Sequence, residues 1–144
     1  MSKKLFVCLL LFVVVFCVCT GCGQQVTQIS GTVTVDGIPA ENLKVLFQAV
    51  SDATTVPPPA FGITDKSGKY QLILASNKRS GVIPGEYAVF INWEDPNPAK
   101  DDNTNHAAPY KIPSNALRGE LRYNVKVGKP QTADFHLVNI LDVP

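Results

Sequence analysis

The stretch Phe61-Gly-Ile-Thr-Asp-Lys-Ser-Gly-Lys-Tyr-Gln-Leu-Ile-Leu74 decides how this chain folds. Its centre is polar, and on both sides apolar residues alternate with others, at Phe61, Ile63, Tyr70, Leu72 and Leu74. In the centre, Asp65 can accept a hydrogen bond from an amide two residues further on, and Gly68 can adopt a positive φ. The stretch therefore predicts two strands joined by a tight turn, and by itself it names no chemistry.

Similar alternations recur along the rest of the chain, separated by turn signals such as Asp36-Gly37. They predict further strands at 26–35, 42–48, 86–93, 121–127 and 133–137. The strand at 86–93 is apolar on both faces, which indicates that something covers both. No segment has a sustained helical period. About seven strands with turns every 8–12 residues predict an all-β fold, a seven-stranded Greek-key β-sandwich.

The length fits one domain, and the cysteines exclude a disulfide framework from its body. The chain has 144 residues, and its four cysteines lie at Cys8, Cys17, Cys19 and Cys22. Residues 1–21 contain two of the 13 basic residues and none of the 12 acidic ones, so the remainder has a formal charge of 11 − 12 = −1. Without a basic stripe, nucleic acid is not an expected partner.

Residues 1–21 have the pattern of a cleaved signal peptide. Lys3 and Lys4 precede an apolar run from Leu5 to Val18. A positive start followed by an apolar segment is typical of a secretory signal. The run to Thr20 has about 16 residues, fewer than the ~20 that a membrane-spanning helix needs. We therefore expect an extracytoplasmic protein.

The end of this leader, Val18-Cys19-Thr20-Gly21-Cys22, resembles the lipobox of bacterial lipoproteins. In that motif a small residue precedes a cysteine that is acylated, with palmitate among its chains, and becomes the new N-terminus. The resemblance implies a lipid anchor on Cys22, although Cys19 stands where the family usually has Leu. Two other interpretations stay open: an uncleaved N-terminal anchor, and a redox or metal-binding Cys-x-x-Cys pair.

The lipobox resemblance also implies a domain organisation and a location. It divides the chain into a lipoprotein signal peptide at 1–21, a lipidated tether at 22–25 and a β-sandwich domain at 26–140. Gly23 is not the Asp that retains some lipoproteins in the inner membrane. The implied place is therefore the outer membrane or the periplasmic face of the cell envelope.

Three motifs in the body resemble a known domain family. They are Ile29-Ser-Gly-Thr-Val-Thr-Val-Asp-Gly-Ile-Pro39, Gly62-Ile-Thr-Asp-Lys-Ser-Gly-Lys-Tyr70 and Ile83-Pro-Gly-Glu-Tyr87. Together with Asp134-Phe-His-Leu137, they resemble the carboxypeptidase regulatory-like domains, which have a transthyretin-like (prealbumin-like) sandwich. The resemblance covers about residues 26–140 and implies a fold rather than an activity, because this fold has unrelated roles.

No motif in the body predicts an enzyme or a cofactor. The carboxypeptidases that carry such a domain have their zinc ligands in a separate domain, and nothing here resembles them. A transthyretin-like hydrolase of urate breakdown ends in Tyr-Arg-Gly-Ser, whereas this chain ends in Leu-Asp-Val-Pro. His106 and His136 stand alone in the sequence, and we interpret both as solvated residues.

One loop offers a weak metal-site pattern. Asp101, Asn103 and Asn105 alternate as calcium ligands do in an EF-hand loop. However, His106 stands where that loop needs Gly, and Ile112 stands where it needs a bidentate Glu. A looser calcium cage is an open alternative to a hydrated polar loop, and we assign no metal ligand.

A ligand surface is the more serious possibility. Glu94 to Ala116 is a long irregular stretch, which in a compact domain is either functional or mobile. Trp93 precedes it and Tyr110 lies within it. Aromatic faces beside polar side chains suit a glycan or peptide groove. The alternative interpretation is that Trp93 caps the core and Tyr110 holds the loop down.

From these observations we expect a non-enzymatic, lipid-anchored structural or interaction module of the cell envelope. Its expected partners are the membrane, through the lipid on Cys22, and an envelope protein or glycan. The alternative is an accessory lipoprotein that binds a glycan or peptide with the surface around Trp93 and Tyr110.

Overall fold

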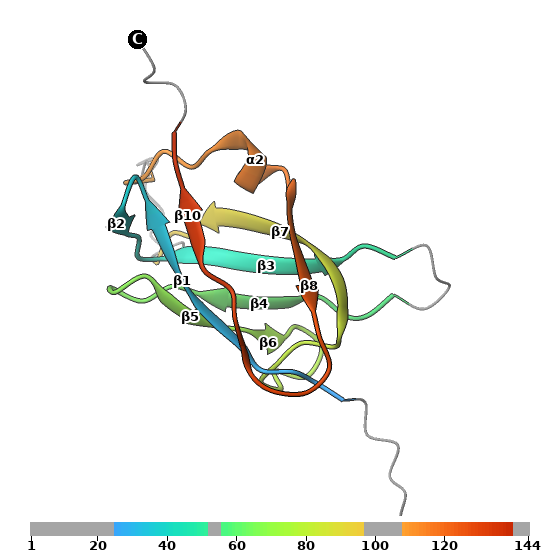
Figure 1. The fold of residues 1–144 in the computed structure, drawn as a ribbon. Helices are drawn as coiled ribbons and strands as arrows, with labels where there is room; N and C mark the ends of the chain where they lie inside the picture. The colour runs from blue at the N-terminus through green and yellow to red at the C-terminus, as the bar shows by residue number, and fades with distance from the viewer. Residues whose placement is uncertain (1–24, 52–55, 97–107, 140–144) are drawn as a thin grey trace, which may run out of the picture.

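The computed structural model describes residues 25–51, 56–96 and 108–139, and the regular secondary structure of this part is almost all β-strand. Its strands form two sheets, and one short helix, α2 (Ser114–Leu117), lies between β7 and β8 (Figure 1). The strands are β1 (Ile29–Val35), β2 (Ile38–Pro39), β3 (Leu43–Ala49), β4 (Ala60–Ile63), β5 (Lys69–Gln71), β6 (Ile73–Leu74), β7 (Gly85–Trp93), β8 (Leu121–Val125), β9 (Gln131–Thr132) and β10 (Phe135–Leu137). The predicted all-β class is confirmed.

The first sheet is built around β1. On one edge β1 pairs in parallel with β9 and β10, and on the other it pairs antiparallel with β5 and β2. The alternation in the sequence correctly predicts which side chains of β1 face the core: Ile29, Val33 and Val35 are buried, while Ser30 is exposed. A strand with one apolar face covers a core with that face and meets solvent with the other.

The second sheet is antiparallel throughout, in the order β6-β4-β3-β7-β8. Its longest ladder joins β3 to β7, from Leu43 opposite Trp93 to Ala49 opposite Tyr87. Inward-facing residues of both strands are fully buried, among them Val45, Val89 and Ile91. Burying one such side chain contributes about 1.5–3 kcal/mol, so this ladder forms the centre of the fold.

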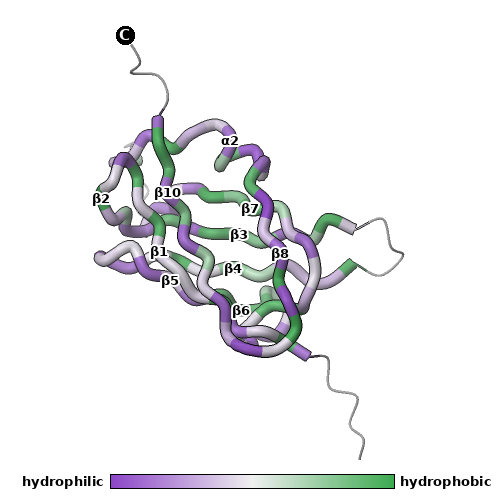
Figure 2. Tube along the Cα trace, in the orientation of Figure 1, coloured by the Kyte–Doolittle hydropathy of each residue, from purple (hydrophilic) through white to green (hydrophobic). Residues whose placement is uncertain are grey.

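Phe47 joins the two sheets at the centre of the core. Its ring centroid lies 5.8 Å from that of Tyr87 and 5.6 Å from that of Tyr123, both in its own sheet. It also lies 6.3 Å from the ring of Phe135 in β10 of the other sheet. Offset and edge contacts of this kind stabilise beyond the area they bury. Figure 2 shows the hydrophobic residues concentrated along β3 and β7.

Two buried tyrosine hydroxyls serve the fold. The Tyr70 hydroxyl donates to the carbonyl of Ala133 at 2.6 Å, and the Tyr87 hydroxyl donates to that of Ile83 at 2.7 Å. Burial raises the pKa of Tyr87 to about 12 and raises the pKa of Tyr70 as well. Both hydroxyls therefore remain protonated donors, and each holds a loop against a strand.

The stretch 61–74 reverses direction as the sequence predicts, but the segment after the turn pairs with strands of both sheets. The backbone of Ser67 donates to Asp65 Oδ1 at 2.8 Å, and Gly68 has a φ of 74°. Beyond the turn, β5 pairs with β1 of the first sheet, whereas β6 pairs with β4 of the second. The segment therefore crosses from one sheet to the other at Leu72.

Gly62 explains how β4 and the crossing segment can lie so close. A Cβ at this position would stand 2.5 Å from the carbonyl oxygen of Gln71, closer than any side chain allows. In β4 the buried positions are Ala60 and Gly62, so Phe61 and Ile63 face outward. The strand thus presents its large apolar residues to the outer face, contrary to what their alternation indicates.

The seven predicted strands correspond to β1, β3, β4, β5 with β6, β7, β8 and β10. One of them is interrupted, and two additional short strands were not predicted: β2, after the Asp36-Gly37 turn, and β9. The last predicted residue of the sixth strand, Val127, lies beyond β8 and is 66% exposed, so the predicted end of this strand, two residues past Val125, is wrong.

The helix α2 lies in the stretch that the sequence marks as irregular. It packs against β7. The residues after it reach Phe90 on the outer face of that strand, since a Cβ on Gly119 would stand 2.3 Å from the Phe90 ring. This cover explains why both faces of β7 carry apolar residues.

The sandwich has two ends, and they carry different parts of the chain (Figure 1). We call the end where the described chain begins the N-terminal end; it contains residues 25–28, 48–51, 56–59, 75–84 and 126–130. We call the other the distal end; it contains residues 36–42, 64–68, 93–96, 108–112 and 138–139. The described chain enters at the first and finishes at the second.

Candidate functional site

The predicted ligand surface around Trp93 and Tyr110 lies at the distal end. Trp93 closes β7 opposite Leu43 and is half-buried against the core. The next residue, Glu94, donates its backbone N–H to the carbonyl of Asn42 at 2.9 Å. The indole therefore covers the distal end of the core and keeps part of its surface in solvent.

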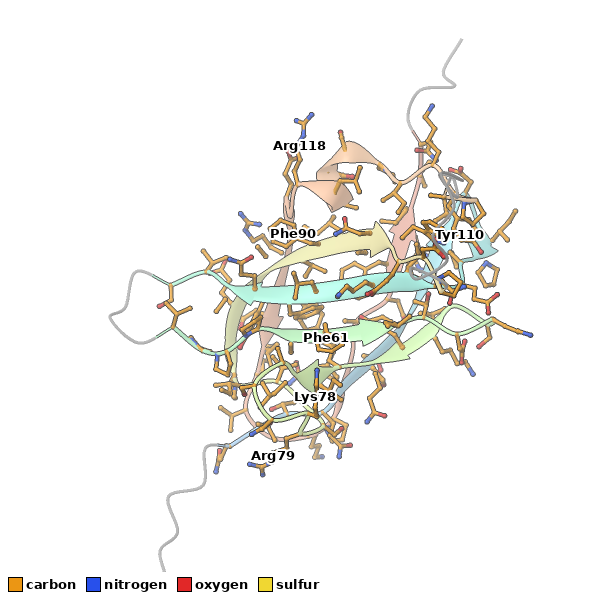
Figure 3. All side chains as sticks on the ribbon, turned by 180° about the vertical axis from the view of Figure 1, so that it is seen from behind. Phe61, Lys78, Arg79, Phe90, Tyr110 and Arg118 are labelled. Carbon is orange, nitrogen blue, oxygen red and sulfur yellow. The ribbon has the colours of Figure 1, made fainter. Side chains whose placement is uncertain are left out.

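Tyr110 fastens the chain that leads into α2. Its hydroxyl accepts a hydrogen bond from the backbone N–H of Glu41 at 3.0 Å, and its ring packs against the core. Figure 3 shows Tyr110 at the distal end, beside the connection between β2 and β3. These contacts fit the interpretation in which Trp93 covers the core and Tyr110 holds the loop.

The structure places Trp93 and Tyr110 at the same end and shows no ring contact between them within the described residues. Residues 97–107, which connect them, lie outside the described part. Asp101, Asn103, Asn105 and His106 are therefore outside it as well. A ligand role for the two aromatic residues stays a prediction.

Asn139 joins two other segments of the distal end, close in sequence to Tyr110, by hydrogen bonds. Asn139 donates its backbone N–H and its side-chain N–H to the two carboxylate oxygens of Asp36, at 3.0 and 2.9 Å. Its side chain also donates to the carbonyl of Lys111 at 2.7 Å. The two bonds that Asp36 accepts from Asn139, first the one from the backbone and then the one from the side chain, lower the pKa of the exposed Asp36 carboxyl.

The Asp65 carboxylate accepts hydrogen bonds from other residues of its own turn. One carboxylate oxygen accepts from the Ser67 hydroxyl at 2.7 Å, from the Ser67 N–H at 2.8 Å and from the Lys69 N–H at 3.0 Å. These bonds, first the one from the Ser67 hydroxyl, lower the pKa of Asp65. The predicted turn interpretation of Asp65 and Ser67 is confirmed in its geometry.

An open hollow of about 610 Å³ lies beside this turn, over β1 and β5. Its polar lining includes Thr32, Asp65, Lys69 and Asp134. Asp134 Oδ1 accepts from the backbone N–H of Thr32 at 2.8 Å, which holds the segment between β9 and β10 against β1. The sequence could not reveal this hollow, because its carboxylates come from two distant turns that only the pairing of β1 brings together.

A row of apolar residues crosses the outer face of the second sheet. Ile73 faces Phe61, Phe61 faces Leu46, and Leu46 faces Phe90 in the strand register. The ammonium of Lys78 lies 4.6 Å from the centroid of the Phe61 ring and that of Lys44 lies 5.5 Å from it. Figure 3 shows Phe61, Lys78 and Phe90 on this face. Cations over an aromatic ring partly cover it.

The remaining predicted site residues divide into two groups. His136 is exposed in β10, where its Nδ1 lies 2.9 Å from Thr34 Oγ1. Cys8, Cys17, Cys19, Cys22 and His106 lie outside the described residues. Within the described ranges, no group of three or more His, Cys, Asp or Glu side chains is arranged to hold a metal ion.

The described part of the chain also contains no helix with the length and hydropathy needed to cross a bilayer. Comparisons with models of protein families, with curated proteins and with solved structures found no match to this chain.

Proposed function

We propose that the protein is a lipid-anchored, non-catalytic interaction module of the bacterial cell envelope. The observation that carries this proposal is the leader that ends in Thr20-Gly21-Cys22, five residues before the first backbone pairing of the sandwich at Thr27. A cysteine acylated at that point would attach the folded body to a membrane through a very short tether. Two or more acyl chains give firm anchoring, because each buried methylene contributes about 0.8 kcal/mol.

The interaction role is supported by how the sandwich uses its polar groups. Asp36 and Asp65 hold turns, and the buried Tyr70 and Tyr87 hydroxyls hold loops. These groups stabilise the scaffold. Other exposed side chains at the two ends of the sandwich are available for contact with partners. Its finer identity, a Greek-key sandwich of the transthyretin-like, carboxypeptidase regulatory-like kind, is part of this proposal. The motifs at 29–39, 62–70 and 83–87 support it.

Substitution of the anchoring cysteine tests the proposal. Cys22→Ala should remove the protein from the membrane fraction of expressing cells or leave it as an unprocessed precursor, because no acylated N-terminus can form. Intact-mass measurement of the wild type should show cleavage before Cys22 and attached acyl chains. Cys17→Ala is the matched control and should leave both results unchanged. A Cys22→Ala protein that is cleaved and yet stays on the membrane would contradict the anchor.

The second candidate function is binding of a glycan or peptide at the distal end. It is favoured by the half-exposed Trp93 and by Tyr110 at the same end, both held in place by the fold. Trp93→Ala in the full chain should abolish signals on a glycan and peptide array. Phe61→Ala, which removes an aromatic ring from the outer face instead, should preserve them. Signals that survive in Trp93→Ala would exclude this surface.

A further inference from the structure

Basic residues gather at one end of the sandwich. The N-terminal end carries four basic side chains, and the adjoining start of β7 carries one acidic residue: Lys78, Arg79, Lys126, Lys129 and Glu86. The distal end carries five acidic and two basic side chains, Asp36, Glu41, Asp65, Glu94, Asp95, Lys66 and Lys111. The adjoining starts of β3 and β5 add two more basic residues there, and one of them, Lys44, forms an ion pair with Glu94 at 3.3 Å; the other is Lys69. The described residues thus have a basic N-terminal end and a nearly balanced distal end.

The basic side chains of the N-terminal end are exposed and available. Within the described residues, Arg79, Lys126 and Lys129 form no ion pair with a carboxylate. Lys78 lies over the Phe61 ring, which leaves its charge uncompensated. Asp52, in the connection between β3 and β4, lies outside the described residues. Four basic groups with few acids around them produce a positive potential at this end.

The turn after β8 presents its lysines from a fixed backbone. Gln131 Nε2 donates to the carbonyl of Lys126 at 2.7 Å, and the Lys126 N–H donates to Gln131 Oε1 at 3.3 Å. Between the two lysines, Val127 is 66% exposed, although it is apolar. An exposed apolar side chain flanked by lysines suits the boundary between lipid headgroups and acyl chains.

The same end is where the chain comes in from Cys22. Thr27 exchanges two backbone hydrogen bonds with Val82, both of 2.8 Å, and its hydroxyl donates to the carbonyl of Lys126 at 2.9 Å. Five residues of extended chain span at most about 18 Å, so a lipid on Cys22 keeps this end within that distance of the headgroups. Electrostatic attraction acts over about 8 Å at physiological salt, which lies within the reach of the tether.

We propose that the N-terminal end of the sandwich docks on anionic phospholipid headgroups, through Arg79, Lys126 and Lys129, with Val127 inserted between them. This inference rests on the proposed lipid anchor and adds an orientation to it. The sandwich then stands on the membrane, and its distal end, with Trp93 and Tyr110, faces away from the surface. The N-terminal end is favoured for docking because its basic side chains have few acidic neighbours, whereas basic and acidic side chains are mixed at the distal end.

Hydrogen exchange of the full acylated chain on vesicles tests this orientation. One vesicle preparation is phosphatidylcholine alone, and the other contains about one third phosphatidylglycerol, to which basic residues near the surface are attracted. Amides of residues 126–129 should exchange more slowly on the anionic vesicles than on the neutral ones. About 1 M salt should remove the difference, because it shortens the Debye length to about 3 Å.

A charge-neutralised pair and its matched control identify the surface. Each basic residue near an anionic membrane strengthens binding about fivefold, so Lys126→Gln with Lys129→Gln should lower the ratio of docked to undocked protein about 25-fold. Lys66→Gln with Lys111→Gln, at the distal end, should change nothing. All four side chains are exposed, and the salt dependence of the wild type provides an independent readout.

Three results would overturn the proposal. Equal exchange on neutral and anionic vesicles, with the protein still sedimenting with both, would exclude docking and leave the anchor intact. An equal effect of the distal pair would show that net charge rather than this end is responsible. Release of the protein from both vesicle types would refute the anchor itself, and the docking that depends on it.

Discussion

The turns at Asp36-Gly37 and at 65–68 each begin with Asp and end with Gly, but their surroundings in the fold differ. Gly37 has a φ of 82°, and a Cβ on it would meet no atom within 4 Å. Gly68 has a φ of 74°, but a Cβ on it would stand 2.5 Å from the carbonyl oxygen of Val33. The first turn extends into solvent, whereas the second is packed against β1.

Turn chemistry thus determines where the chain reverses, but not which strand the returning segment pairs with. After Gly37 the chain pairs with the strand it has just left, in β2. After Gly68 it pairs first with β1 and only then, in β6, with β4. The carbonyl of Gly68 accepts from the Val33 N–H at 2.8 Å, so this turn extends the ladder between β5 and β1.

The largest expected effect is unfolding of the whole body, in which both turns are lost. Val89→Asp places a charge in a fully buried position of β7, which no partner can compensate. Such a substitution should cost more than about 4 kcal/mol and unfold the body. Thermal unfolding followed by circular dichroism measures it. Asn92→Asp, on the exposed face of the same strand, is the control and should melt as the wild type does. A cooperative transition of Val89→Asp near that of the wild type would refute the inward assignment.

The comparison itself predicts a difference between two identical substitutions. Gly68→Ala should destabilise by about 3 kcal/mol, because positive φ costs an L-residue about 1 kcal/mol and overpacking against backbone adds about 2. Gly37→Ala should cost only the first part, about 1 kcal/mol. Urea unfolding of both variants measures the two free energies. Equal losses would mean that Gly68 is not packed against β1.

The smallest effect is a pH dependence shared by both turns. Hydrogen bonds from Ser67 lower the pKa of Asp65, and those from Asn139 lower the pKa of Asp36, from an ordinary value of 3.8. A lowered carboxyl pKa stabilises the folded state above the unfolded value, and this contribution is lost as pH falls through the folded pKa. Asp65→Asn and Asp36→Asn should therefore melt below the wild type at pH 7.

The difference in melting temperature should disappear as the pH falls below 3.8. Scanning calorimetry of the wild type and both variants across this range measures it. A difference that persists at the lowest pH would show that the two carboxylates act through packing rather than through charge.

Much of the secondary structure could be predicted from the sequence, for local reasons. Period-two alternation located β1, β3 and β7 to within a few residues, because a half-buried strand needs one apolar face. Asp36-Gly37 and Asp65 through Gly68 marked reversals, because positive φ and Asx hydrogen bonds are properties of short segments. The outward direction of Phe61 could not be predicted, since it depends on the close approach of Gly62 to Gln71.

The candidate sites were only partly accessible to sequence reasoning. Trp93 and Tyr110 could be selected because aromatic residues beside a long polar stretch are conspicuous. Their common location at the distal end follows from the β3–β7 register and from the bond between Tyr110 and Glu41. The basic N-terminal end could not be selected at all, because Arg79 and Lys126 are 47 residues apart in the chain.

The sequence by itself determined the β-class of the body and the positions of its turns, and it predicts the leader with its terminal cysteine, because each depends on neighbouring residues. The tertiary structure alone decided which strand each segment joins, which face of β4 is buried and where the charges gather. Those properties arise from contacts between distant parts of the chain, formed when two apolar sheet faces exclude water from a common core.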